Sequence, residues 1–302
     1  MGMLLDMCAA HVYQILNHYT PREDLDPGFE VLDNSSNERP DWYEYWPIRN
    51  FLVREPLDES GFYGFLSPKF RLKTNLTAAQ VEDFLAHAAP GTDVCLFSPS
   101  IHNAAYFLNV FEHGESEHPG LKAVATRFFE RIGRPCNLDE LVSDSRNTVH
   151  ANYFIAKPRF WRAWLEVNER LFAIAEARED ALGRELSAPT DYRGRTDVQM
   201  KIFVMERIAT WLLTRDAAFK AEVRDPFAAR SRIYKLPVAV VCDALKIAYS
   251  TQGRGQYKDV FLLVRKLKGF LNLQVRLGAK LGFGRMRPSL NTLRSYWRSE
   301  AR

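Results

Sequence analysis

Short runs of β-forming residues alternate along this chain with segments of helical periodicity, and this alternation constrains the fold more than any other feature. The predicted strands occupy residues 9–16, 29–32, 61–66, 93–97 and 152–156. The most regular helical segments begin near Pro158 and Val198, where apolar residues recur every three or four positions. Strands that alternate with helices predict an α/β fold with a mainly parallel sheet flanked by helices.

Local signals add detail to two of the helices. Thr77 and Gln80 have the spacing of a reciprocal N-terminal cap, so a helix is expected to begin directly after Thr77. The apolar stripe in residues 198–212 predicts one continuous helix. On that helix Glu206 falls at the edge of the stripe, and Arg207 is expected to face solvent or a partner.

Composition places the chain among globular proteins. It has 302 residues and is 46% hydrophobic, so it can bury a core and fits one large domain or two ordinary ones. Its four cysteines form no Cys-x-x-Cys unit, which disfavours a zinc site and a disulfide framework. The first residues lack the basic segment of a signal peptide, and no apolar run approaches the length that crosses a bilayer. We therefore expect a cytoplasmic protein.

Charge is distributed unevenly. Residues 254–302 contain 12 basic and two acidic side chains, whereas the rest of the chain carries a net charge of −6. We therefore divide the chain into a main domain, residues 1–252, and a basic helical C-terminal extension, residues 253–302. One helical face of the extension is apolar and comprises Val260, Leu263, Val264, Leu267, Phe270 and Leu271. Such a helix favours peripheral contact with an anionic inner-membrane surface; the alternative is that its apolar face packs on the main domain.

Aromatic residues and an arginine gather in residues 37–50. At helical spacing one face carries Trp42, Tyr45, Trp46 and Arg49. A guanidinium beside stacked rings can hold a phosphate next to a base or a sugar, so these residues are candidates for binding a nucleotide-sugar donor. The alternative is an aromatic core helix whose arginine pairs with an acidic residue.

Two lysines, Lys69 and Lys157, follow predicted strands at the position where ligands of open α/β sheets bind. Tyr63 belongs to the strand that leads to Lys69, a candidate for contact with a diphosphate; the alternative is a solvated lysine. Asp144, ahead of the strand at 152–156, and Glu206 are candidate catalytic carboxylates. Their alternatives are a turn residue and a salt-bridged carboxylate, respectively.

Metal and nucleotide motifs are weak in this sequence. Asp24 and Asp26 have the spacing of a carboxylate pair for a divalent ion, but they lie in a Pro/Gly turn that favours a structural role. Residues 112–118 contain His and Glu without a His-Glu-x-x-His pattern, which favours a solvated loop. No Walker A, Gly-x-Gly-x-x-Gly or Gly-x-Ser-x-Gly motif occurs. A Mn²⁺ or Mg²⁺ ion would suit a nucleotide-sugar donor, but the sequence assigns it no ligands.

The order of these segments resembles a family of uncharacterised bacterial proteins from capsule and lipopolysaccharide gene clusters that are regarded as GT-A-like glycosyltransferases. The resemblance spans residues 9–213. It rests on five segments in the same order. An Asn-rich loop with an aromatic helix occupies residues 33–50, and a Tyr/Gly strand with a basic ending occupies 62–70. A strand that begins with Asp (93–96), a strand that begins with Asn and leads into an aromatic helix (152–165), and a helix with a Glu-Arg pair (204–208) follow. The ending Ser67-Pro68-Lys69 departs from the family, where that position is usually richer in His and Arg.

The resemblance implies a GT-A-like fold and transfer of a sugar from a nucleotide-sugar donor to a cell-surface polysaccharide or glycolipid acceptor. It adds Asn152 to the candidate donor-binding residues. In such an enzyme Lys69 would offset charge on the departing nucleoside diphosphate, and Asp144 or Glu206 would act as general base if the reaction inverts.

Two other functions stay open at this point. One is a non-enzymatic α/β module that contacts nucleic acid or a partner complex through its basic extension, although the acidic main domain and the lack of a nucleic-acid motif argue against nucleic acid. The other is a transferase fold retained as a scaffold.

Overall fold

A computed structural model of the chain describes residues 9–99, 104–192, 195–227 and 236–280. Its main sheet has six strands in the order β2-β1-β3-β5-β4-β8. These strands are β1 (Ala10–Asn17), β2 (Glu30–Asn34), β3 (Phe62–Leu66), β4 (Val94–Leu96), β5 (Phe154–Ala156) and β8 (Ala221–Val223). β5 runs antiparallel to β3 and β4, and the other neighbours are parallel. The predicted α/β class and mostly parallel sheet are confirmed.

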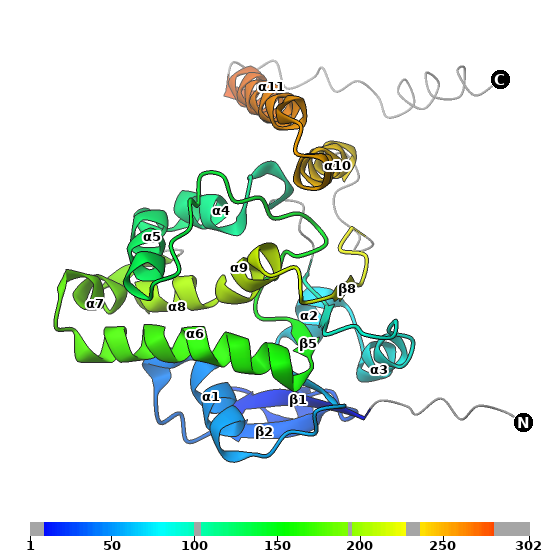
Figure 1. Cartoon of the computed structure of the whole chain (residues 1–302), viewed down its shortest axis with the longest axis vertical. Coiled ribbons are helices and arrows are strands. Elements are labelled where there is room, and N and C mark those ends of the chain that lie inside the picture. Colours follow the sequence, from blue (N-terminus) through cyan, green and yellow to red (C-terminus); the bar gives the residue numbers. More distant parts are fainter. Residues whose placement is uncertain (1–8, 100–103, 193–194, 228–235, 281–302) are drawn as a thin grey trace, which may run out of the picture.

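Helices cover both faces of this sheet (Figure 1). One face packs against α2 (Phe70–Thr74) and α3 (Ala78–Ala86), and the other against α1 (Tyr45–Arg54) and α6 (Pro158–Ala177). A further layer over α6 comprises α4 (Val110–Glu117), α5 (Leu121–Arg131), α7 (Ala181–Leu186), α8 (Met200–Met205) and α9 (Ile208–Arg215). Short 3-10 helices lie at Arg22–Asp24, Pro40–Trp42 and Ala104–Tyr106, and β6 (Pro189–Tyr192) pairs with β7 (Arg195–Gln199).

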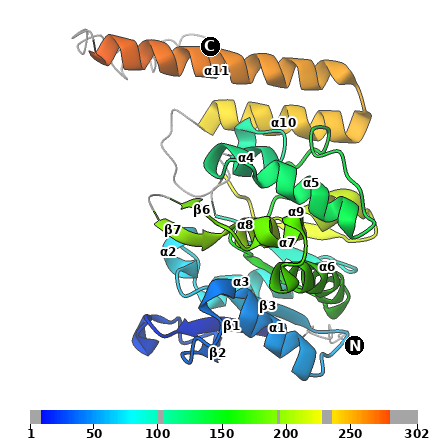
Figure 2. The same ribbon diagram turned by 90° about the vertical axis from the view of Figure 1, so that its left-hand side faces the viewer.

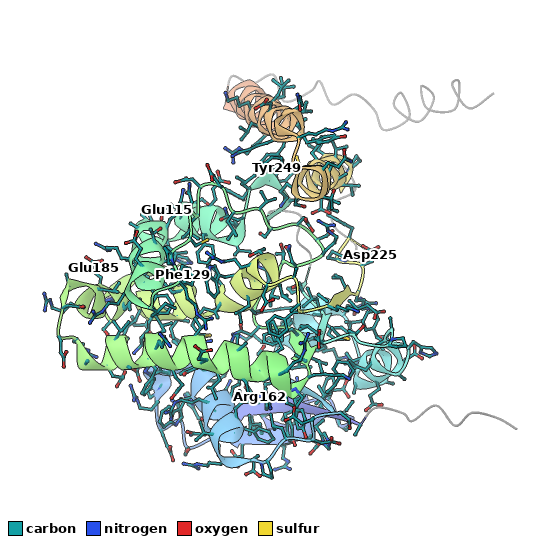
Figure 3. All side chains as sticks on the ribbon, in the orientation of Figure 1. Glu115, Phe129, Arg162, Glu185, Asp225 and Tyr249 are labelled. Carbon is teal, nitrogen blue, oxygen red and sulfur yellow. The ribbon has the colours of Figure 1, made fainter. Side chains whose placement is uncertain are left out.

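The alternation of side chains along β3 explains why the sheet is buried on both faces. Phe62 and Leu66 belong to the core cluster formed with α2 and α3. Tyr63 and Phe65 belong to the larger cluster formed with α1 and α6. The layer above α6 is packed in the same way, since the ring of Phe129, labelled in Figure 3, stacks on Trp211 of α9 with centroids 4.4 Å apart.

Some predicted helix boundaries are confirmed and others are wrong. Thr77 and Gln80 form the reciprocal cap at the start of α3, as expected. The segment at 112–118, predicted as a loop, instead lies largely in α4. This helix forms because the side chain of Asn109 accepts hydrogen bonds from the first backbone amides, Phe111 N and Glu112 N.

The helix predicted over residues 198–212 is interrupted. It breaks at Glu206 and Arg207, which form a turn between α8 and α9. The expectation that Arg207 faces solvent or a partner is wrong, because its partly buried guanidinium packs against other residues of the main domain. Arg207 Nε donates to the carbonyl oxygen of Val110 at 2.9 Å, and Nη1 donates to that of Phe203 at 2.5 Å.

Two antiparallel helices, α10 (Leu236–Gln252) and α11 (Gly255–Lys280), lie at the end of the molecule opposite β1 and β2 (Figure 2). Gly253, with φ of +67°, makes the turn between them. α10 packs on the rest of the main domain through a small core that includes Ala105, Ala239 and Cys242. No helix in the described part of the chain is long and apolar enough to cross a membrane.

Candidate functional site

Buried polar side chains collect along the carboxyl edge of the sheet, where the parallel strands end. Asn152 lies there because antiparallel β5 begins at this edge. The parallel strands contribute Asn17 and Asn34, and the residues just beyond β3 and β4 are Ser67 and Ser98. Each of these side chains belongs to a residue less than a tenth exposed. Ligands of open α/β sheets bind at this edge, so it is the best candidate for a functional site.

Hydrogen bonds hold this edge together. Ser67 Oγ and the Tyr153 hydroxyl lie 2.6 Å apart, which joins the end of β3 to the start of β5. Gln14 Nε2 donates to the carbonyl oxygen of Ser67 at 3.3 Å. Asn34 Nδ2 donates to Asn17 Oδ1, also at 3.3 Å. The edge is therefore a connected polar framework rather than a set of isolated side chains.

The segment that leads into β5 has a strained backbone. Ala151 and Asn152 are both left-handed, with φ of 56° and 53°. This region disfavours alanine, because its Cβ crowds the backbone. Ser98 holds the segment in place, since its Oγ donates to Thr148 O at 2.9 Å and accepts from His150 N at 3.0 Å. Strain that the surroundings enforce in this way is concentrated at functional sites.

The side-chain amide of Asn152 is only partly satisfied. Its Nδ2 lies 3.4 Å from Met205 Sδ, whereas its buried Oδ1 has no hydrogen-bond partner among the described residues. A buried acceptor without a donor is costly, so this oxygen is suited to a ligand group or a water that supplies the hydrogen. The contact with Met205 also brings Asn152 next to the turn at Glu206.

Glu206 lies in the turn between α8 and α9 and is partly exposed. No hydrogen bond or ion pair joins its carboxylate to another described residue. Burial raises the pKa of Glu206 and Glu44 raises it further, while the positive charges of Arg207 and Lys73 oppose the shift. An unpaired carboxylate with a raised pKa holds a proton more tightly than an ordinary glutamate does, which suits it to act as a general base.

Two lysines lie at the carboxyl end of β3. Lys69 is the N-cap residue of α2 and Lys73 lies one helical turn later, so they share a helix face. Lys73 Nζ lies 5.4 Å from the centre of the Tyr153 ring, and its charge acts on Glu206. Lys69 is exposed and makes no ion pair within the described ranges. This end of the sheet therefore combines two cations with an unpaired carboxylate.

A cavity of about 240 Å³ lies between the edge strand β2 and α1. Its lining includes Asp33 and Asn34 from the end of β2, and Trp46 and Asn50 from α1. Trp46 is partly exposed, and Asp33 is exposed. An aromatic ring, amides and a carboxylate are the groups that bind a base and a ribose, so this cavity is a candidate nucleoside site.

The other members of the predicted aromatic face have a structural role. Trp42 and Tyr45 are fully buried, and their rings pack against Phe172 of α6, so neither has a face free for a ligand. Arg49 donates to both carboxylate oxygens of Glu169, at 2.5 and 2.7 Å. For these three predicted donor-binding residues, the structure supports the alternative interpretation of a core helix whose arginine is paired.

Tyr63 and Asp144 also have structural partners. Tyr63 lies near the amino end of β3, away from the carboxyl edge, and its hydroxyl accepts a hydrogen bond from Asp58 N at 2.8 Å. Asp144 is fully buried, and its two oxygens accept from the Arg146 side chain at 2.9 and 2.8 Å. The carboxylate of Asp144 is therefore not accessible to an acceptor hydroxyl. Of the two predicted catalytic carboxylates, only Glu206 stays a candidate for the general base.

Sequence reasoning overlooked Lys73, Glu44 and Tyr153. The spacing of four residues between Lys69 and Lys73 is a signal that could have found the second cation. Tyr153 gave no such signal, because its contact with Ser67 depends on the antiparallel pairing of β5 with β3.

Within the described ranges, no group of three or more His, Cys, Asp or Glu side chains is arranged to hold a metal ion. No protein-family model, curated protein or solved structure matches this chain. The family suggested by the order of the sequence segments therefore stays a proposal, and its support comes from the geometry of the site.

Proposed function

We propose that the chain is a GT-A-like glycosyltransferase that moves a sugar from a nucleotide-sugar donor to a saccharide or lipid-linked acceptor. One observation carries the proposal: the unpaired Glu206 carboxylate lies near the cationic face of α2, at the carboxyl edge of a mostly parallel sheet. Glycosyl transfer needs these two elements, since a base must take the proton of the acceptor hydroxyl and positive charge must stabilise the departing diphosphate.

The donor fits along the sheet edge in this proposal. Its nucleoside occupies the cavity beside β2, in contact with Asn34 and Trp46. β1 separates β2 from β3, so the two strands lie about 10 Å apart at the usual strand spacing. β2 also ends three residues, about 10 Å, farther along β1, because Asn34 pairs with Asn17 whereas Leu66 pairs with Gln14. The diphosphate extends back from the nucleoside toward Lys69 and Lys73, which follow β3. The edge thus offers separate positions for the two halves of the nucleotide.

Glu206 acts as the general base of a single displacement. It accepts the proton of the acceptor hydroxyl while that oxygen forms a bond to the anomeric carbon of the sugar. The bond from this carbon to the diphosphate oxygen breaks, and the nucleoside diphosphate leaves with the electron pair. Lys69 and Lys73 offset the charge that develops on it. Attack from the side opposite the leaving group inverts the anomeric configuration.

Asn152 has a positioning role in the same scheme. Its unpaired Oδ1 can accept a hydrogen bond from a sugar hydroxyl, which would satisfy a buried acceptor that otherwise lacks a donor. The left-handed backbone at Ala151 and Asn152 determines where this oxygen lies.

A nucleotide-binding screen tests the proposal. Thermal unfolding is followed with UDP, GDP, CMP and dTDP, each with and without Mn²⁺. We expect one nucleotide to raise the unfolding temperature, because a ligand at 100 times its Kd adds about 2.7 kcal/mol. Lys69→Ala and Lys73→Ala should each weaken this binding roughly tenfold, since each removes a charged hydrogen-bond donor.

Arg71→Ala is the matched control, because Arg71 is exposed on α2 but points away from the face shared by the two lysines. It should leave nucleotide binding unchanged. An equal loss in all three variants would contradict the assignment of the diphosphate site. No shift with any nucleotide would contradict the transferase and favour a partner-binding protein.

A further inference from the structure

α11 presents an apolar stripe to solvent. The stripe consists of three residues on one helical face that are 45%, 55% and 53% exposed: Val260, Leu263 and Leu267. Another face of the helix contacts the rest of the protein. Phe261 is fully buried, and Arg265 Nη1 donates to Glu112 Oε1 of α4 at 2.6 Å. These contacts fix the rotation of α11, so the stripe is held outward.

One alternative drawn from the sequence was that the apolar face of this helix packs on the main domain. For the stripe this prediction is wrong, because Phe261 and Arg265 make the contact with the rest of the protein instead. Val264, predicted to share the stripe, is partly buried. Phe270 and Leu271, predicted to continue it, have side chains outside the described residues.

Exposed apolar side chains are concentrated on the two C-terminal helices. Among the described residues, eight large hydrophobic side chains are exposed, and five of these belong to α10 and α11. Besides the stripe, they include Val240 and Val241, which are 42% and 48% exposed on α10. α11 is the outermost layer of the molecule in both views (Figures 1 and 2). An apolar surface gathered at one end of a protein marks an interaction site, whereas scattered single residues do not.

The positive charge around the α11 stripe indicates what kind of partner covers it. The segment that contains the stripe, residues 254–302, has 12 basic and two acidic residues, and the exposed Lys266 lies beside the stripe on α11. A second copy of the chain would bring two strongly basic segments together, which like-charge repulsion opposes. Nucleic acid would neutralise the basic residues but leave the stripe in water. An anionic bilayer satisfies both features, because its acyl region accepts the leucines and its phosphates attract the lysines and arginines.

We propose that the α11 stripe docks this protein on an anionic lipid surface, with α11 lying parallel to the membrane plane. Leu263 and Leu267 enter the boundary between headgroups and acyl chains, while Lys266 beside the stripe contacts lipid phosphates. Arg265 does not take part, because Glu112 already binds it and thereby keeps the stripe facing outward.

Vesicle sedimentation with the full chain tests this proposal. Vesicles of phosphatidylcholine alone are compared with vesicles that contain about 30% phosphatidylglycerol. We expect binding to the anionic vesicles only, and weaker binding as salt rises from about 0.05 to about 0.5 M. Leu263→Asp and Leu267→Asp should each lower the partition coefficient about tenfold or more, since each removes the burial of one leucine.

Leu72→Asp is the matched control, because Leu72 is 83% exposed on α2, in the main domain. It should bind vesicles like the wild type. All three positions are exposed, so the variants should keep the unfolding temperature of the wild type. Full vesicle binding by both stripe variants would overturn the proposal, as would the absence of binding to anionic vesicles.

Two further results would also overturn lipid as the partner. One is a dimer in sedimentation velocity that Leu263→Asp dissociates, without vesicle binding. The other is tight binding to duplex DNA in place of vesicles. The nucleotide screen uses no lipid, so the transferase and the docking surface can succeed or fail separately.

Discussion

Arg207 donates a hydrogen bond from Nε to the carbonyl oxygen of Val110 at 2.9 Å, and this contact ties the turn between α8 and α9 to the start of α4. The turn carries Glu206, the residue directly before Arg207. Gly114 leaves room for the guanidinium, since a Cβ at that position would overlap it. The position of the proposed base is therefore set by a contact that comes from a different helix.

Gly114→Ala is expected to disturb this contact. The added methyl group overlaps the Arg207 guanidinium and Leu121, so the unfolding free energy should fall by about 1–3 kcal/mol and sugar transfer should fall with it. Urea unfolding measures the first effect. Gly255→Ala is the control, because nothing lies within 4 Å of a Cβ built there, and it should change neither quantity. An unchanged Gly114→Ala protein would show that the turn does not depend on this packing.

Arg49→Ala is expected to affect stability rather than nucleotide binding. Arg49 and the Tyr45 hydroxyl both donate to the partly exposed Glu169, so loss of the guanidinium should cost roughly 1 kcal/mol of unfolding free energy in this solvent-screened pair. Nucleotide affinity should stay at the wild-type value. A specific loss of nucleotide binding, with unfolding unchanged, would restore Arg49 to the donor site.

The same pair predicts a pH dependence. Burial alone would raise the pKa of Glu169, but hydrogen bonds from Arg49 and Tyr45 hold it below its usual value. A carboxyl with a lowered folded pKa stabilises the protein above the unfolded pKa, and this contribution is lost as pH falls through the folded value. Arg49→Ala should therefore lose less stability than the wild type when pH is lowered through this range. Parallel urea titrations of the two proteins would reveal an equal loss if this interpretation is wrong.

Two histidines predict a further loss of stability in mild acid. Burial, together with nearby positive charge, lowers the pKa of His113 to about 4, and burial lowers that of His150 to about 3. The unfolded chain takes up these protons near pH about 6.5, whereas the folded chain does not, so stability falls as pH drops below that value. We expect a loss of roughly 1–2 kcal/mol per histidine between pH 7 and pH 5. His113→Gln should reduce this slope in urea unfolding, and an unchanged slope would contradict the assignment.

Strands β1 to β5 could be predicted because each is a short apolar run bounded by turn residues, and each overlaps its predicted range. Strands β6, β7 and β8 were not predicted, and β7 includes the first residues of the helix expected over 198–212. The antiparallel direction of β5 could not be predicted from these runs. The turn at Glu206 was also hidden, because its stability depends on carbonyl groups of Val110 and Phe203 that accept from Arg207. A periodic pattern records which residues are apolar, but it does not record partners on a distant helix.

The aromatic helix shows the same limit in a functional setting. A face with Trp42, Tyr45 and Arg49 has the same spacing whether it binds a ligand or packs on a neighbouring helix. Only the position of Glu169 and Phe172 on α6 distinguishes the two cases. Glu206 was predicted at the edge of one continuous helix, whereas it lies in the turn between α8 and α9. Its role, like that of Lys69, stays a prediction.

The most direct test of the central claim compares Glu206→Gln with the wild type. The nucleotide that stabilises the chain is first titrated against both proteins, and release of nucleoside diphosphate from its sugar conjugate is then measured with a mixture of saccharide acceptors. We expect Glu206→Gln to bind the nucleotide normally and to unfold no more easily, because burial disfavours the lost charge. Its transfer rate should fall about 10²- to 10⁴-fold, the usual contribution of a general base. A variant that transfers sugar at the wild-type rate would contradict the assignment of Glu206 as the general base.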